Sequence, residues 1–212
     1  MDEIFQKLCD KMVEEQLKSR DIRLEAVLDA MRSVPRHLFV PEAAQSHAYN
    51  DGPMPIGLGQ TISQPYIVAY MTQQLAPFPG RKILEIGTGS GYQAAILAHL
   101  GCQVYTMELL EEHAQKAEKL LAELNYSDVK VKCGNGFLGW PEEAPFDAVI
   151  VTAAPAKIPE KLIEQLKDGG KMIIPVGPPH MVQYLRLIIK SGVRNIDREL
   201  LAVRFVPMLE KI

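Results

Sequence analysis

The sequence predicts an α/β protein: a doubly wound, mostly parallel sheet with an N-terminal helical cap and an antiparallel C-terminal edge. Three observations predict this class. From residue 80 onward, short apolar runs alternate with segments of helical character, as in a parallel sheet with helices on both faces. A glycine-rich turn follows the first apolar run. The last two β-like runs have no helix between them, so we expect them to pair antiparallel.

The first 79 residues predict helices and one long loop. Residues 2–33 read as two helices, and Asp21 is placed to cap the second one. Pro35 ends that helix. Residues 34–64 are rich in Pro and Gly and show no clear period, and an irregular stretch of this length usually has a function. Pro65 suits the first position of a further helix.

The elements after residue 80 are predicted in order. The expected strands are 82–86, 103–107, 129–133, 146–151 and 171–176, and the expected helices are 91–99, 109–124 and 159–167. Lys167–Gly170 is typical of a helix stop. Tyr184–Lys190 and Leu200–Val206 would form the antiparallel edge. A chain of 212 residues suits one domain, 1–212, in which 1–79 carries the N-terminal helices and the loop and 80–212 forms the α/β core.

The amino-acid composition limits the classes of binding partner that the protein can have. The net charge is −3 and the charged residues are scattered, so nothing favours nucleic acid. Three cysteines without metal spacing indicate reduced thiols, and no apolar run approaches membrane-spanning length. None of the histidines, at 37, 47, 99, 113 and 180, lies at metal-ligand spacing from a partner. We therefore expect a cytoplasmic protein that binds no metal, membrane or nucleic acid. We also expect a monomer.

A glycine-rich loop is the most informative local feature. The strand that contains Glu85 is followed by glycines at 87, 89 and 91, and then by a helix. Glycine allows positive φ and close approach of the backbone to a ligand, and the N–H groups of a helix start face the same point. Dinucleotide folds space their glycines differently, and a P-loop lysine is missing. The spacing predicts a nucleotide-type site, and the alternative is a glycine-rich turn with no ligand.

Two further strand ends would meet this loop, because ligands of open α/β sheets lie beyond the carboxyl ends of the strands. Glu108 ends the second strand and can accept hydrogen bonds from both hydroxyls of a ribose. Its charge could also stabilise the start of the helix that follows, and both roles can hold together. Asn135 lies between two glycines after the third strand and could accept from an adenine amino group. Asparagine between glycines is also ordinary turn chemistry.

The glycine spacing after a strand that carries Glu85 resembles motif I of the S-adenosylmethionine-dependent methyltransferases, whose Rossmann-like fold agrees with the predicted class. Further runs, in order along nearly the whole chain, resemble the protein-L-isoaspartate O-methyltransferases. These runs are Val34–Arg36, Phe39–Pro41, Asp51–Tyr66, Phe146–Pro155, Gly169–Gly177 and Val203–Pro207.

The resemblance implies that a methyl group passes from S-adenosyl-L-methionine to the free carboxylate of L-isoaspartyl residues in damaged proteins or peptides, leaving S-adenosyl-L-homocysteine. The ester would then collapse to a succinimide, whose hydrolysis restores some normal aspartyl linkages. Ser63 matches the active-site hydroxyl of the family. The implied cofactor residues are Thr61, Ile62, Ser63, Gln64, Glu85, Gly87, Thr88, Gly89, Gly91, Glu108, Leu109, Asn135 and Gly136, and the implied substrate residues are Pro55, Ile56, Gly57, Gln60 and Val206. The family usually has Asp where this chain has Asn135, so we expect weaker cofactor binding but retained activity.

The expected chemistry suits these residue types. A carboxylate is already ionised at neutral pH, so no general base is required. Catalysis then rests on positioning, and a neutral donor such as Ser63 would orient the carboxylate without quenching it. Ser63 could instead only cap the helix that begins at Pro65. The competing functions are a methyltransferase of another substrate and a cofactor-binding adaptor without turnover.

Overall fold

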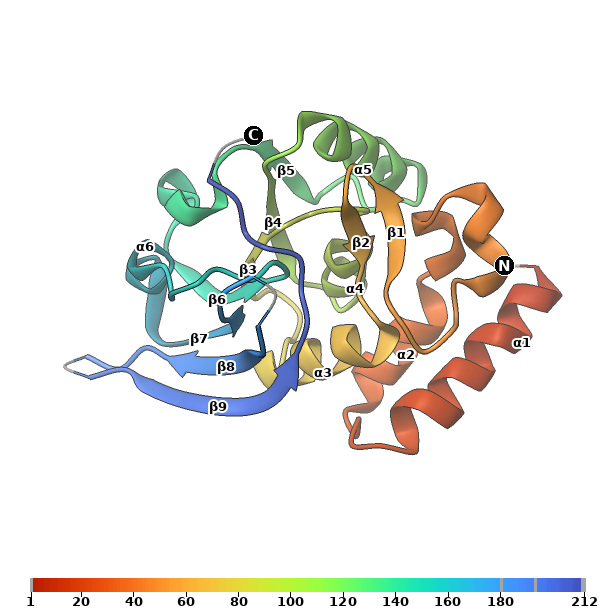
Figure 1. Cartoon of the computed structure of the whole chain (residues 1–212), viewed down its shortest axis with the longest axis horizontal. Coiled ribbons are helices and arrows are strands. Elements are labelled where there is room, and N and C mark those ends of the chain that lie inside the picture. Colours follow the sequence, from red (N-terminus) through yellow and green to blue (C-terminus); the bar gives the residue numbers. More distant parts are fainter. Residues whose placement is uncertain (1, 180, 193, 211–212) are drawn as a thin grey trace.

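A seven-stranded sheet forms the centre of the computed structural model, which describes residues 2–179, 181–192 and 194–210 (Figure 1). The strands lie in the order β5-β4-β3-β6-β7-β8-β9. They comprise β3 (Lys82–Ile86), β4 (Gln103–Glu108), β5 (Lys130–Cys133), β6 (Phe146–Val151), β7 (Leu166–Val176), β8 (Gln183–Ile189) and β9 (Ile196–Val203). The first five pair in parallel, and β8 pairs antiparallel with both β7 and β9. The predicted fold class, including its antiparallel edge, is confirmed.

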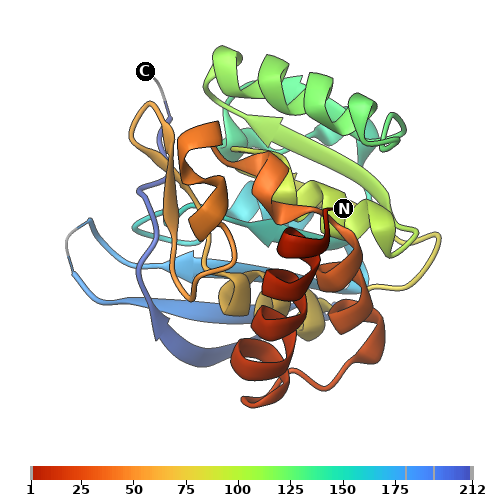
Figure 2. The same ribbon diagram turned by 90° about the vertical axis from the view of Figure 1, so that its right-hand side faces the viewer.

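Apolar cores lie on the two faces of the sheet. One core joins the sheet to α1 (Glu3–Met12), η1 (Val13–Lys18), α2 (Glu25–Ser33), α3 (Pro65–Leu75), α4 (Tyr92–His99) and α5 (Glu111–Glu123). The other joins the opposite face to α6 (Glu160–Glu164). Figure 2 shows α1 and α2 packed side by side as the predicted N-terminal cap. Strand residues alternate between the cores, with Ile83 in the first and Leu84 in the second, because successive side chains of a strand point to opposite faces.

The predicted cap of the second helix is wrong. Helix α2 begins at Glu25. Its N-cap residue is Leu24, whose side chain makes no capping hydrogen bond. The backbone N–H of Leu24 donates instead to Oε1 of Gln73, on α3, at 2.9 Å. Asp21 accepts a hydrogen bond from the Tyr66 hydroxyl at 2.8 Å. The side chain of Gln73 therefore fixes the residue that precedes the helix, while Asp21 contacts Tyr66 and does not cap α2.

The predicted helix stop at Lys167–Gly170 is also wrong. Helix α6 ends at Glu164, and these residues belong to β7. Gly169 N–H donates to Lys190 O, and Lys190 N–H donates to Gly170 O, each at 2.9 Å. Pairing with the neighbouring strand thus overrides the local turn preference of two consecutive glycines.

The segment 34–64 contains more regular structure than its lack of period predicted. It forms the 3₁₀ helices η2 (Arg36–Phe39) and η3 (Glu42–His47), followed by an antiparallel hairpin of β1 (Met54–Gly57) and β2 (Gln60–Ile62). Two further 3₁₀ turns, η4 (Gly136–Leu138) and η5 (Pro141–Glu143), follow β5.

The last strand also differs from expectation, since β9 starts at Ile196 and stops at Val203, so that Arg204–Val206 leave the sheet. Among the described residues, no helix has the length and apolar character needed to span a bilayer.

Candidate active site

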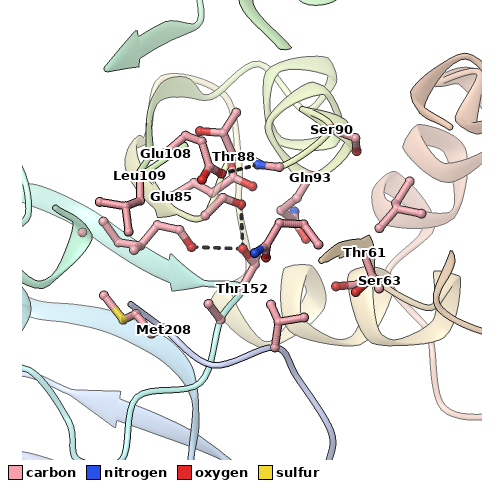
Figure 3. Close-up of a pocket in the computed structure, with 18 of the residues that line it drawn as sticks. Thr61, Ser63, Glu85, Thr88, Ser90, Gln93, Glu108, Leu109, Thr152 and Met208 are labelled. Carbon is pink, nitrogen blue, oxygen red and sulfur yellow. Dashed lines mark hydrogen bonds between the residues drawn. The ribbon is translucent and has the colours of Figure 1, made fainter. Parts of the chain in front are cut away.

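A pocket opens at the carboxyl ends of β3, β4, β5 and β6, where the sequence placed the ligand site (Figure 3). We call it the main pocket. Its empty space, including the part open to solvent, is about 940 Å³. It is lined by Gln60, Thr61, Ile62, Ser63, Val68, Met71, Glu85, Ile86, Gly87, Thr88, Gly89, Ser90, Tyr92, Gln93, Met107, Glu108, Leu109, Leu110, Gly136, Thr152, Ala153, Val206, Pro207, Met208 and Leu209. Strand ends, the β1–β2 hairpin and the C-terminal segment therefore all contribute to one cavity.

The glycine loop has the backbone that its sequence predicts. Gly87 has a φ of 97°, and a Cβ there would lie 2.4 Å from Oγ1 of Thr152. That hydroxyl donates to the carbonyl oxygens of Ile86 at 3.0 Å and Gly87 at 2.7 Å. Glycine is thus required at 87 for both its conformation and its packing. Thr152 fastens the loop to the end of β6.

Glu108 joins the loop to the next helix. The residue is buried, with 8% of its surface exposed, and its side chain lines the main pocket. Its Oε2 accepts from the N–H of Gly89 at 2.8 Å, and its Oε1 accepts from the N–H of Leu110, the N-cap of α5, at 3.0 Å. The carboxylate therefore supports the helix start. Because each carboxylate oxygen has two lone pairs, each retains one that can face a ligand.

Glu85 is a second acid in the same cavity (Figure 3). It is fully buried, and its Oε2 accepts from the Thr106 hydroxyl at 2.6 Å. Its Oε1 has no hydrogen-bond partner in the part of the chain that the structure describes. Burial, and to a smaller extent the nearby Glu108 carboxylate, raise the pKa of Glu85 to about 8. The main pocket thus contains an unsatisfied acid that a cationic ligand group would favour in its ionised form.

Ser63 lies where the main pocket meets a second cavity, the side pocket. The side pocket is lined by Pro53, Thr61, Ser63, Gln64, Ile67, Met181, Val182, Ala202, Val203, Arg204 and Phe205. Gln64, not Ser63, is the N-cap of α3, and no side chain caps that helix start. Within the described residues no hydrogen bond involves the Ser63 hydroxyl, so the interpretation that Ser63 only caps the helix is wrong.

A buried arginine that the sequence reasoning missed supports the Ser63 backbone. Arg36 is fully buried and donates to the carbonyl oxygens of Ser63 and Ala48, each at 2.7 Å. Its guanidinium lies 4.9 Å from the ring centroid of Tyr92, at the start of α4. Arg36 therefore links the turn that carries Ser63 to the helix that follows the glycine loop. The run Val34–Arg36 entered the sequence reasoning only as part of the family resemblance.

The hairpin lies against the glycine loop. A Cβ built at Gly89 would contact Cδ1 of Ile56 at 3.4 Å. His113, a buried residue of α5, approaches the carbonyl oxygen of Gly57 through Nε2 at 3.3 Å. These contacts place the β1–β2 hairpin over one side of the main pocket.

The predicted site residues fall into three groups according to the pocket that they line. Of the eighteen positions predicted for cofactor and substrate, twelve line the main pocket and Gln64 lines only the side pocket. The five others, which are Gly91, Asn135, Pro55, Ile56 and Gly57, line neither pocket.

The position of Asn135 differs from the expected one. Its Oδ1 accepts from the N–H of Phe137 at 2.9 Å, which is the turn chemistry that the sequence left as the alternative. Gly136 does line the main pocket, and a Cβ there would lie 2.4 Å from Cγ2 of Ile86.

Several lining residues were missed. Thr152 and Ala153 directly follow β6, so the strand-end rule used for Glu108 could have found them. Gln93 is the second residue of α4, and Met208 comes from the C-terminal segment. No local signal marks Met208, because only the crossing of the chain over the sheet brings it to the pocket. Among the described residues, no three His, Cys, Asp or Glu side chains are grouped to hold a metal ion; His180 lies outside the described residues.

Comparisons with known proteins agree along almost the whole chain. The family model described as protein-L-isoaspartate(D-aspartate) O-methyltransferase matches residues 7–212. A protein-L-isoaspartate O-methyltransferase of Opitutus terrae is 56% identical over 93% of this chain and 85% of its own length. One of Gloeobacter violaceus is 51% identical over 93% of this chain and 96% of its own length.

Solved structures agree with the sequence relatives. A Plasmodium falciparum protein described as a protein-L-isoaspartate O-methyltransferase, in complex with S-adenosyl-L-homocysteine, superposes with a TM-score of 0.83 at 26% identity. The match covers 98% of this chain and 99% of that one. A second protein-L-isoaspartate O-methyltransferase structure gives a TM-score of 0.84 at 26% identity, over 96% of this chain and 65% of the other.

Proposed function

The chain belongs to the protein-L-isoaspartate(D-aspartate) O-methyltransferase family, and we propose that the main pocket holds its methyl donor while Ser63 orients the acceptor. The enzyme transfers the methyl group of S-adenosyl-L-methionine to the free carboxylate of L-isoaspartyl residues in proteins and peptides. The methyl ester then closes to a succinimide, and hydrolysis of that ring restores some normal aspartyl linkages.

The residues of the main pocket fit this donor. When bound, S-adenosyl-L-methionine supplies an activated methyl group on a positively charged sulfur. The Oε1 of Glu85, which bonds no described residue, can face a cationic group of the cofactor, and that group would favour the ionised carboxylate. The unused lone pairs of Glu108 can accept from the ribose hydroxyls. Gly87–Gly89 line the same cavity, and glycine allows a ligand to approach their backbone closely. The orphaned oxygen of Glu85 is the observation on which this fit rests.

A separate part of the main pocket would hold the adenine base of the cofactor. Leu109, Gly136 and Met208 line the pocket beyond Glu108 and would pack on the base. The contact of Asn135 with the adenine amino group stays a prediction, because its Oδ1 already accepts from Phe137. An amide oxygen has a second lone pair, so a weak additional hydrogen bond is still compatible with this geometry.

The acceptor is proposed to enter through the side pocket. Ser63 and Thr61 line both cavities, so a peptide in the side pocket can extend one carboxylate to the donor. That carboxylate is ionised at neutral pH and needs no base. The Ser63 hydroxyl, which bonds no described residue, can donate to it as a neutral group. The position of this hydroxyl between the two pockets is the single observation that carries the proposed mechanism.

The test offers methyl-labelled donor to two peptides of one sequence, one isoaspartyl and the other normal aspartyl. We expect transfer to the isoaspartyl peptide, base-labile label as in a methyl ester, and at most traces on the normal one. Equal labelling of both peptides, or of neither, would contradict the proposed substrate.

We also propose that the enzyme works in the cytoplasm as a monomer, with 1–79 supplying the substrate loop and 80–212 the cofactor core, and that it binds neither membrane nor nucleic acid. The three cysteines are free thiols. Burial raises the pKa of Cys9 to about 12 and that of Cys102 to about 11, so neither thiol ionises readily. Sedimentation at equilibrium tests the monomer, and a dimer mass would contradict it.

A further inference from the structure

The chain crosses the open end of the sheet after β9 ends, as the dark blue segment in Figure 1. We call Arg204–Met208 the C-terminal strap. Ala154, just beyond β6, holds its second half: the N–H of Ala154 donates to Val206 O at 2.8 Å, and the N–H of Met208 donates to Ala154 O at 2.9 Å. The strap lies on both cavities, because Phe205 lines the side pocket and Val206 lines the main pocket.

A glutamine side chain holds the first half of the strap. Gln183 begins β8 and is only 2% exposed. Its Oε1 accepts from the N–H of Phe205 at 2.6 Å, and its Nε2 donates to the carbonyl oxygen of Phe205 at 3.2 Å. The backbone of Gln183 pairs with Val203, the last residue of β9. The side-chain amide therefore takes the place of a strand partner where the sheet pairing stops.

Gly177 packs closely against Gln183. A Cβ at Gly177 would lie 2.9 Å from the Cα of Gln183 and 3.1 Å from its Cγ. Since a backbone atom cannot move away cheaply, only glycine at 177 allows Gln183 to occupy its place. Gly177 thus permits the close packing that places Gln183 where its side chain binds the strap.

We propose that Gln183 is a positioning residue for the peptide substrate. It fixes the backbone of Phe205, and through it Val206, so that the wall shared by the two pockets keeps its shape. The anchor at Ala154 is independent of Gln183, so the cofactor end of the strap stays in place without it. This inference rests on the proposed function, in which the side pocket receives the peptide.

The test compares Gln183→Leu with a matched control, Gln165→Leu. Gln165 is also buried and also binds a loop through both amide atoms, accepting from Trp140 N–H and donating to Leu138 O, each at 2.8 Å. It lines neither pocket. We expect Gln183→Leu to raise the KM for the isoaspartyl peptide by about tenfold because two hydrogen bonds are lost, with the Kd for S-adenosyl-L-homocysteine unchanged. Gln165→Leu should change neither constant.

Two additional measurements keep the outcome decisive. Hydrogen exchange at the Phe205 amide should accelerate in Gln183→Leu, a result that does not depend on the identity of the substrate. Gln183→Glu, which retains an acceptor for the Phe205 N–H but loses the donor, should raise KM less than Gln183→Leu. An unchanged KM and unchanged exchange, or an equal rise of KM in the Gln165→Leu control, would overturn the inference. Failure of wild-type protein to methylate the isoaspartyl peptide would refute the proposed function instead.

Discussion

Replacing Glu85 with glutamine should show separately how this buried carboxyl group affects the stability of the fold and how it affects binding of the methyl donor. The substitution preserves the shape of the side chain and the hydrogen bond from Thr106. Burial raises the pKa of Glu85 from 4.5 to about 8. Between these two values the folded protein retains a proton that the unfolded chain has released, so this group makes folding less favourable as the pH rises. Glutamine has no proton to lose, so the variant should become more stable than the wild type with increasing pH.

The magnitude follows from the shift. Each pH unit across this interval corresponds to about 1.4 kcal/mol. The stability advantage of Glu85→Gln should therefore grow from about 1 kcal/mol at pH 5 to about 3 kcal/mol at pH 7. The assay is chemical denaturation of both proteins, without cofactor, at a series of pH values. Glu112→Gln is the control, because Glu112 forms only an exposed ion pair with Lys116, and its effect should be small at every pH.

Binding should change in the opposite direction. If the free Oε1 of Glu85 faces a cationic group of the donor, the neutral amide should weaken S-adenosyl-L-methionine binding at pH 7 by about tenfold. Calorimetry measures this affinity. A stability difference that stays constant between pH 5 and pH 7 would refute the buried-acid reasoning, and an unchanged affinity would refute the placement of the donor against Glu85.

The remaining predictions concern the same cavity. Glu108→Ala should weaken binding of S-adenosyl-L-methionine at least about tenfold, because two charge-assisted hydrogen bonds are lost; an unchanged affinity in calorimetry would contradict the ribose contact. Gly87→Ala should abolish detectable cofactor binding, since its Cβ would lie 2.4 Å from the Thr152 hydroxyl, and Gly87→Ala with normal affinity would show that the loop can shift. Ser63→Ala should lower kcat more than it weakens cofactor affinity, as steady-state kinetics and calorimetry can compare; equal losses in both would make Ser63 only a binding residue.

Local patterns predicted much of the cofactor half. The apolar run ending near Ile86 and the glycines after it are neighbours in sequence, and Glu108 ends the next strand along the chain. Their geometry follows from strand and turn preferences together with the rule that parallel strands end at the same edge. Gly87 and Glu108 therefore line the pocket as expected, although Asn135 makes the ordinary turn contact and does not line it.

Local patterns were wrong where a distant partner decided the outcome. Asp21 accepts from the Tyr66 hydroxyl on α3 and does not cap α2. Lys167–Gly170 joined β7 because Lys190 pairs with two of these residues. In each case a hydrogen bond between segments far apart in sequence outweighed a local preference. The local sequence does not indicate which distant residue will form such a bond.

The amino-acid sequence by itself determined the fold class, the glycine loop and, through the resemblance, the family. These depend on periodicity and on residues that are contiguous in the chain. The tertiary structure alone decided how Arg36 holds Ser63, how Oε1 of Glu85 is left without a partner among the described residues, and how Gln183 holds the strap. Each of these depends on which groups are buried against one another, and burial is settled only when the whole chain has packed.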